Sequence, residues 1–231
     1  MKKKIPIYSE VVYLLSNVVI AVAVSMITAS ALGMSMIVSP AYLISEKVGF
    51  LTFGQGEYVV QSILFVLMCV ILKKIKPLFF AAFGTCLLYG LVLDAVRAMV
   101  PLFDPNVTPA GSMGWPVRIL LFVIGVPLTS FGIALSFHTY LYPQVVDFFA
   151  KAMIDHFHLD RAKFKTCYDA AFFVLSLVLS FAFFGKIVAI GVGTIVMVLC
   201  NGFLLDRFSR WLEAHFEIKP LFPNVAKAFE V

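Results

Sequence analysis

Charged residues are scarce in this 231-residue sequence, and the shortage excludes an ordinary soluble domain. Asp, Glu, Lys and Arg make up 13% of the chain and apolar residues 61%, with a mean hydropathy of +0.99. Soluble globular domains contain about 25% charged and about 45–50% apolar residues. Too few polar side chains are present to cover a surface in water, so the composition indicates that most of the chain lies in lipid.

The motifs of many soluble enzymes and binding modules are also missing. The four cysteines lie inside apolar segments without C-x-x-C spacing, which argues against a disulfide framework and a zinc site. No H-E-x-x-H, G-x-S-x-G or P-loop pattern occurs. The net charge of +5 is spread over the ends of apolar runs instead of one basic stripe. We therefore expect no enzyme activity, no cofactor, no metal and no nucleic-acid partner.

Long apolar runs are what the sequence does contain. Each of six runs is long enough, with tilt, to cross the roughly 30 Å bilayer core as a helix. Helices are expected because backbone groups in lipid must bond within their own segment, and the period-two alternation of a membrane barrel is absent. The expected spans are roughly Val11–Ala31, Glu57–Leu72, Pro77–Val100, Val117–Leu141, Lys165–Phe184 and Ile187–Phe208.

Two shorter stretches, Met34–Gly49 and Tyr142–Phe157, differ from the six runs. Each has a proline near its start and charges near its end, and each is too short and too polar to span. They are expected as re-entrant or interfacial amphipathic helices.

The positions of the basic residues predict the orientation of the chain. With six spans and the N-terminus inside, 14 of the 18 Lys and Arg fall on the inner side, and the outer side holds Lys47, Arg97, Arg118 and Lys186. Because cytoplasmic loops carry an excess of Lys and Arg, both termini are expected in the cytoplasm. Residues 211–231 would then form a cytoplasmic tail of a single membrane domain.

The chain repeats a short pattern. Gly-x-x-Leu-Asp occurs at Gly90–Asp94 and at Gly202–Asp206, each preceded by Gly-Thr. The order of elements also repeats: a span, a short proline-containing helix, a polar turn and two spans, over about residues 11–100 and 117–210. Three crossings in each copy would make the two copies enter the membrane from opposite sides. The sequence therefore predicts an all-α membrane protein of six helices in two inverted three-helix repeats.

This arrangement resembles a known family. The order of a span, the turn at Leu32 and Gly33, a short amphipathic helix, the polar turn at Gly49–Gln55 and a Gly-Thr span is similar to that of YczE/YitT-type bacterial integral membrane proteins. The resemblance covers about residues 11–210. Met36 and Ile37 stand where the family usually has Pro-Trp. The resemblance implies a bacterial cytoplasmic-membrane protein, with transport as the usual supposition, and it does not name a substrate.

The glycine-interrupted stretches are the first candidate site. In transporters built from inverted repeats, substrates bind near the membrane midplane, where helices are broken. The same small residues can instead serve tight helix packing. The candidates are Gly84, Thr85 and Gly90 in the first copy and Gly193, Thr194 and Gly202 in the second.

Ionisable residues within apolar spans are costly and are candidates for function. Asp94 has Arg97 three residues later, and Asp206 has Arg210 four residues later, so each carboxylate has a cation within reach on its own helix. Placed at opposite ends of the inverted repeat, the two aspartates could be gates, or simply ion pairs that mark the membrane interface.

Three further polar residues lie in the apolar spans. Asp169 aligns with Gln61 of the first copy, so the two could form an asymmetric polar site, or Asp169 could be a satisfied helix-end residue. Asn201 could bridge helices.

The function predicted from this plan is that of a small permease for an unidentified small solute or ion. The alternative is a non-transporting membrane subunit that captures a ligand for, or regulates, a larger membrane complex. A polar cavity between the repeats would favour the permease, and a tightly packed interface with an exposed apolar stripe would favour the subunit. The lipid bilayer is the expected partner, with a small-molecule substrate and a homo-oligomer or partner subunit as further candidates.

Overall fold

The computed structural model describes residues 4–74, 79–109, 111–223 and 226. Within them, six helices are long and apolar enough to cross a membrane, as the composition predicts. They are α1 (Ser9–Ser30), α3 (Phe53–Leu72), α4 (Phe79–Met99), α5 (Trp115–Phe137), α7 (Arg161–Phe184) and α8 (Val192–His215). Two shorter helices, α2 (Ser39–Val48) and α6 (Val145–Phe157), form where the short amphipathic stretches were predicted.

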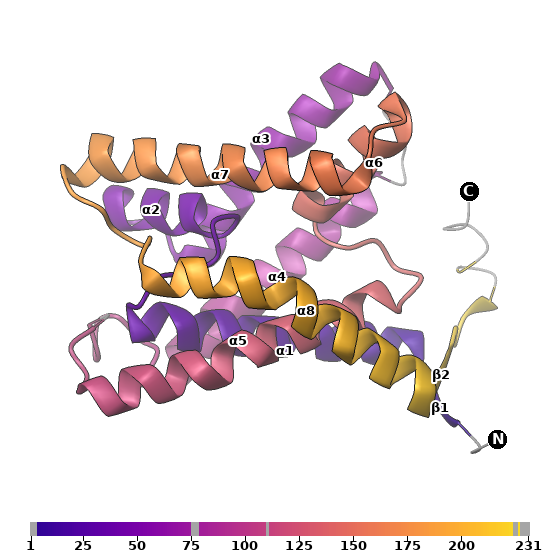
Figure 1. The fold of residues 1–231 in the computed structure, drawn as a ribbon, viewed down its shortest axis with the longest axis horizontal. Helices are drawn as coiled ribbons and strands as arrows, with labels where there is room; N and C mark the ends of the chain where they lie inside the picture. Colours follow the sequence, from indigo (N-terminus) through magenta and orange to yellow (C-terminus); the bar gives the residue numbers. More distant parts are fainter. Residues whose placement is uncertain (1–3, 75–78, 110, 224–225, 227–231) are drawn as a thin grey trace.

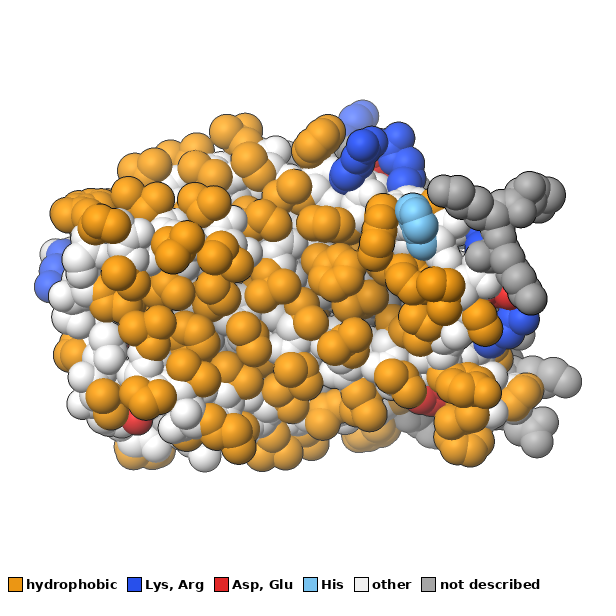
Figure 2. Space-filling model, turned by 90° about the horizontal axis from the view of Figure 1, so that it is seen from below, with side chains coloured by type: hydrophobic (Ala, Val, Ile, Leu, Met, Phe, Trp, Pro, Cys, Tyr) orange, Lys and Arg blue, Asp and Glu red, His pale blue; other side chains and the backbone are white. Residues whose placement is uncertain are grey.

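The outer surface is that of a protein in lipid. Figure 2 shows a broad apolar face with Lys and Arg side chains gathered toward its two ends. Large apolar side chains point outward from the middle of the long helices, and Leu199 and Phe203 on α8 are 74% and 70% exposed. Six such helices indicate a multi-pass membrane protein, because surfaces of this kind are stable in hydrocarbon and not in water.

The bundle is built around α1 and α5. α1 packs along α5 and α4, and α5 packs also against α8, while α2 lies against α3 and α7, and α6 against α3, α4 and α7. The α1–α5 contact is close because glycines of α5 face α1: a Cβ at Gly125 would lie 2.8 Å from Ile27, and one at Gly132 would lie 2.6 Å from Ile20. Small residues at such crossings let helix backbones approach and gain dispersion contacts in lipid.

The last span differs from its predicted bounds. The sequence pattern placed it at Ile187–Phe208, whereas α8 begins at Val192 and continues to His215. The start is delayed because Val188 N bonds to the Ser180 hydroxyl and Ala189 O accepts from Met34 N, which holds this stretch in a loop. The end is extended because Leu212 remains buried and Trp211 packs edge-on against Phe131 of α5.

The expected tail is therefore folded over its first part. After α8, strand β2 (Phe216–Lys219) pairs in parallel with β1 (Ile5–Tyr8) at the start of the chain, with Ile5 opposite Phe216. Glu10 on α1 accepts backbone hydrogen bonds from Leu221 and Phe222 at 2.9 and 3.2 Å. These contacts hold the start of α1 and the end of α8 at the same end of the bundle (Figure 1).

The two short helices lie toward opposite ends of the molecule. In Figure 1, α6 is near the end that carries β1 and β2, whereas α2 is near the end that carries the α4–α5 connection.

Candidate ligand-binding cavity

A cavity of about 110 Å³ lies among the middle parts of α1, α4, α5 and α8, beside the starts of α3 and α6. Apolar side chains of α1 and of residues 34–38 form much of its wall. Polar groups reach it from most of the surrounding elements: Ser35, Glu57, Tyr89, Thr129, Gln144, Asp147 and Asn201. It is therefore a mainly apolar cavity with several polar groups in its wall, and α1, α4, α5 and α8 border it near their centres.

Glu57 is the most buried acidic group in this cavity. Its side chain is 3% exposed, and its Oε2 accepts a hydrogen bond of 3.1 Å from Gln61 Nε2. Its Oε1 is buried without a hydrogen-bond partner among the described residues. A carboxyl group held in this way has unused bonding capacity toward the cavity, and this is costly in a membrane unless a ligand or a proton satisfies it.

Gln61 connects Glu57 to the start of α6. Its Nε2 also donates to Gln144 Oε1 at 3.0 Å, and its Oε1 accepts from Val145 N at 3.0 Å. The amide is fully buried and all of its bonding groups are used. Gln61 thus fixes the position of the Glu57 carboxyl and of the segment that leads into α6.

The start of α3, one turn before Glu57, is fixed by a helix cap and by contacts with α4. Thr52 caps the helix, since its side chain accepts from Gln55 N and its backbone N donates to the Gln55 side chain. Asp94 of α4 adds two bonds to the same turn, accepting from Thr52 Oγ1 at 2.5 Å and from Gly54 N at 2.8 Å. A Cβ at Gly54 would lie 2.2 Å from Gly90 O, so the two helices meet where neither has a side chain.

Asp94 does not form the expected pair with Arg97. Its two oxygens bond to the start of α3, while the Arg97 guanidinium lies over the Phe53 ring at 5.1 Å from the centroid. Both residues line a separate, open pocket of about 510 Å³ between the α2–α3 turn and residues 104–106. The intrahelical pairing predicted from the spacing is wrong here, because a helix N-terminus from a distant segment offers the carboxylate better donors.

Asp206 does form its predicted ion pair, with Arg210 one turn later. Both side chains are more than half exposed, at 56% and 67%. They lie on the second half of α8, beyond Asn201, and do not line the cavity. The two Gly-x-x-Leu-Asp motifs therefore end in aspartates with different surroundings, one capping a helix and the other paired on the surface.

The two Gly-Thr threonines are buried at corresponding contacts. Thr194 Oγ1 donates to Met34 O at 2.8 Å, and Thr85 Oγ1 lies within hydrogen-bond distance of Tyr142 O, at 2.9 Å. Thr85 also accepts from the Tyr13 hydroxyl of α1 at 2.7 Å. Each threonine thus joins its helix to a connection in the other half of the chain.

The predicted glycines fall into two groups. Gly193 and Gly90 lie at close approaches, since a Cβ at Gly193 would be 2.6 Å from the Phe122 ring and one at Gly90 would be 2.3 Å from the Tyr58 ring. Gly84 and Gly202 face open space, since no atom of the described residues lies within 4 Å of the position that a Cβ would take there. The helix crossing expected from the sequence at these two positions is therefore not there.

The pair proposed for Gln61 and Asp169 is not formed. Gln61 belongs to the cavity network, whereas Asp169 forms an ion pair of 2.9 Å with Lys165 on its own helix. Asn201 lines the cavity and its Oδ1 accepts from Ser130 at 3.3 Å, which joins α8 to α5 as a helix-bridging amide would.

Six polar residues of the cavity were not predicted as site residues: Ser35, Glu57, Tyr89, Thr129, Gln144 and Asp147. The sequence predicts Glu57 at the polar start of a span, and its nearest cations along the chain are Lys47 and Lys73. An acidic residue so far from any base was the available signal. Tyr89, with an exposed fraction of 1%, has a hydroxyl without a partner among the described residues. Burial raises the pKa of the Asp147 carboxyl above its usual value, with Lys165 opposing and Asp169 adding to the shift.

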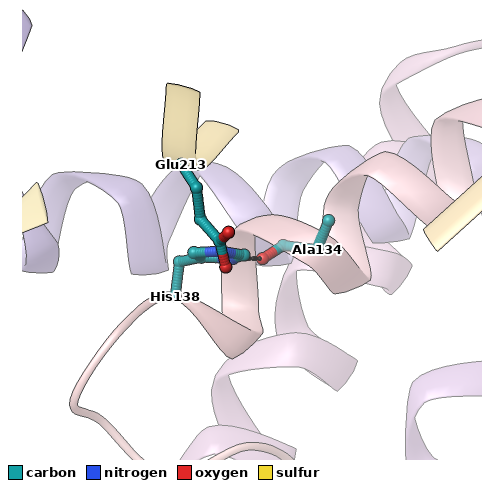
Figure 3. A network of polar contacts seen from close by, with 3 residues as sticks. All are labelled: Ala134, His138 and Glu213. Carbon is teal, nitrogen blue, oxygen red and sulfur yellow. Dashed lines mark hydrogen bonds and ion pairs between the residues drawn. The ribbon is translucent and has the colours of Figure 1, made fainter. Parts of the chain in front are cut away.

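A second polar network lies apart from the cavity, where α5 and α8 end beside the strands. His138 Nδ1 is 2.7 Å from Ala134 O, and its Nε2 is 3.3 Å from Glu213 Oε1 (Figure 3). Because a carbonyl only accepts, Nδ1 must carry the proton, and Nε2 bonds Glu213 when it is protonated too. This network ties two helix ends together. The described residues hold no group of three or more His, Cys, Asp and Glu side chains that could bind a metal.

Residues 7–210 match the model of a family of unknown function, DUF6198, and the chain belongs to that family. Comparison with curated proteins and with solved structures found no match. The resemblance to YczE/YitT-type proteins stays a prediction, since no comparison bears on it. The chain is thus a multi-pass membrane protein of the DUF6198 family, with a cavity among its helices that both apolar and polar side chains line.

Proposed function

We propose that this chain is a small permease of the bacterial cytoplasmic membrane, with both termini in the cytoplasm, that moves a small solute through the central cavity by alternating access. The observation that carries the proposal is the cavity itself. Seven polar residues stand in its otherwise apolar wall, and helices from both halves of the chain surround it. Secondary transporters bind their substrates in such a place, near the midplane and between two repeats.

The neighbours of the helices support an inverted repeat. If α1–α4 correspond to α5–α8, the α1–α4 contact corresponds to the α5–α8 contact, and the α2–α7 contact to the α3–α6 contact. α1 and α5 then pack on the pseudo-twofold axis. The correspondence is not complete, because α3 packs along α4 whereas α7 and α8 hardly touch within the described residues.

The threonine contacts give independent support. Thr85 and Thr194 occupy the same place in the two Gly-Thr pairs, and Met34 and Tyr142 are the first residues of the two short amphipathic stretches. Thr194 bonds to the carbonyl of Met34, and Thr85 to that of Tyr142. An exchange of equivalent bonds between two halves is what a pseudo-twofold arrangement produces.

The alternative, a ligand-capturing or regulatory subunit, has one observation in its favour. α8 presents an apolar face with Val192, Leu199 and Phe203 at least 70% exposed. Lipid or a partner helix could cover that face. A cavity that binds a ligand without releasing it across the membrane would belong to such a subunit.

Uptake into proteoliposomes tests the proposal. Methylammonium, acetate and urea serve as a cationic, an anionic and a neutral probe, and we expect one of them to enter faster than into protein-free liposomes. Met197→Trp should abolish the difference, because Met197 is 2% exposed and lines the cavity. Leu199→Trp, two residues away on the outward face, is the matched control and should retain uptake. Equal uptake by both variants would contradict passage through this cavity.

A further inference from the structure

The charge of the cavity points to the class of ligand. Two of its lining residues, Glu57 and Asp147, are acidic, and no Lys or Arg of the described chain is among the lining residues. Asp147 has Lys165 as a neighbouring cation, whereas no cation among the described residues acts on Glu57. The titratable groups nearest Glu57 on the helices packed against α3 are Cys86 and Tyr89 of α4 and Asp147 of α6. α2 meets α3 at Ala41, Ser45 and Tyr42. None of these groups supplies a positive charge, so an ionised Glu57 needs a cation from outside the protein.

The unused hydrogen-bonding atoms indicate what kind of cation fits. Glu57 Oε1 and the Tyr89 hydroxyl are both buried without a partner in the described chain, and both residues line the cavity. A carboxylate oxygen accepts, and a hydroxyl oxygen can accept as well, so a ligand that donates at least two hydrogen bonds would satisfy both groups. A primary ammonium group carries three donors and one positive charge.

The size and the apolar walls limit the rest of the ligand. A cavity of about 150 Å³ is large enough for benzene, so 110 Å³ admits a smaller molecule, of about five heavy atoms or fewer. Ile20, Val24 and Met197 belong to the apolar wall and would exclude a hydrated metal ion while accepting a short alkyl group.

We infer that the cavity binds a small primary alkylammonium ion, with Glu57 as its counter-ion and Tyr89 as its second acceptor. This inference rests on the proposed permease function and names its substrate class. When the ligand is absent, a proton on Glu57 takes its place, so the ion and the proton compete for the same carboxyl. Ligand entry then requires deprotonation of Glu57, and protonation favours release.

Equilibrium binding of radiolabelled methylammonium to the full chain in lipid nanodiscs tests the inference. We expect saturable binding that propylammonium displaces, and that ethanol and acetate, of similar size without the positive charge, do not displace. Binding should weaken as the pH is lowered. Displacement by sodium as effective as that by propylammonium would show a site for inorganic cations and would overturn the inference.

Two variants assign the binding to this cavity. Glu57→Gln should lower the affinity roughly tenfold or more, the loss expected when a charge-assisted bond is removed. Glu46→Gln is the matched control, because Glu46 lies in the open pocket beside Arg97 and not in the cavity. Tyr89→Phe removes a hydroxyl that has no partner among the described residues, so the protein should fold normally and bind several-fold more weakly. If Glu57→Gln does not fold, Tyr89→Phe and the pH dependence decide, and an unchanged affinity in either would contradict the inference.

The outcomes separate this inference from the proposed function. Uptake of acetate or urea that Met197→Trp blocks, without methylammonium binding, would leave the permease standing and remove the ammonium site. Methylammonium binding that depends on Glu57, without uptake, would support the ammonium site and assign the chain to ligand capture.

Discussion

At the scale of single residues, the same sequence motif has taken two different positions. Asp94 caps α3 through Thr52 and Gly54, whereas Asp206 pairs with Arg210 on an exposed surface. Each has an arginine three or four residues later on its own helix, so the sequence gives no means of telling them apart. The difference comes from a contact about 40 residues distant in sequence, which local patterns do not encode.

The helix cap at Thr52 should contribute more to the stability of the protein than the ion pair between Asp206 and Arg210. Thr52→Ala removes a helix cap and an Asp94 partner, so we expect it to destabilise the protein by about 1 kcal/mol or more and lower the unfolding temperature in detergent. Asp206→Asn disrupts an exposed ion pair worth about 0–1 kcal/mol and should change the unfolding temperature little. A larger effect from Asp206→Asn would mean that the surface pair, and not the α3 cap, holds the fold.

The glycines allow a second comparison of stability. Gly193→Leu forces a side chain against the Phe122 ring and Leu32 O, both within 3 Å of its Cβ position, and should cost about 1–3 kcal/mol or more. Gly202→Leu meets open space on the same helix and serves as the control, with a similar gain in helix propensity. Thermal unfolding of the two variants in one detergent gives the comparison, and equal stabilities would place Gly193 outside a crossing.

The burial of Glu57 could not be predicted from the sequence. Glu57 stands between glycines and a tyrosine at the polar start of an apolar run, where a carboxylate is ordinarily in contact with headgroups. In the structure α3 begins one turn earlier, at Phe53, and Glu57 is buried because α4 and α6 pack against α3. Composition thus predicts that a helix begins near Glu57, and cannot predict that tertiary contacts bury this residue.

At the scale of elements, the length and spacing of the apolar runs predict most of the helices. Six long helices and two short ones form where the apolar runs predict them, because a chain in lipid must close its backbone bonds within each segment. The bounds of α8 were wrong by five residues at its start and seven at its end. Its start is set by bonds to the loop after α1, and its end by packing on α5, and both partners are remote in sequence.

The threonine contacts between elements should matter equally in the two halves. Thr194→Val removes the donor to Met34 O, and Thr85→Val removes the acceptor of the Tyr13 hydroxyl and the hydroxyl beside Tyr142 O. An unpaired buried polar group costs about 1–3 kcal/mol, so each variant should lower the unfolding temperature by several degrees. Thr108→Val, which removes an exposed bond to Pro101 O, is the control. A fall in only one of the two variants would argue against equivalent roles.

At the scale of the whole molecule, the short helices and the connections lie toward two opposite ends of the bundle. β1, β2 and α6 lie toward one end and α2 with the α4–α5 connection toward the other (Figure 1). The bias of Lys and Arg predicts that the first end faces the cytoplasm.

Cysteine labelling in cells tests that orientation. In a chain without its four native cysteines, an impermeant maleimide added from outside should react with Ser112→Cys in the α4–α5 connection. The same maleimide should react with Lys74→Cys, which follows α3, only after the membrane has been permeabilised. The reverse pattern would show that the termini face outward, and labelling of both from outside would rule out an odd number of crossings between them.

The central claim is that the cavity opens in turn to each side of the membrane, and one measurement tests it most directly. Met197→Cys places a single thiol in the cavity wall, and a small cationic methanethiosulfonate reagent is applied from one side with a thiol scavenger on the other. The account predicts modification from either side, slowed by methylammonium, and no modification of Leu199→Cys on the outward face. Modification from one side alone, or none from either, would contradict alternating access.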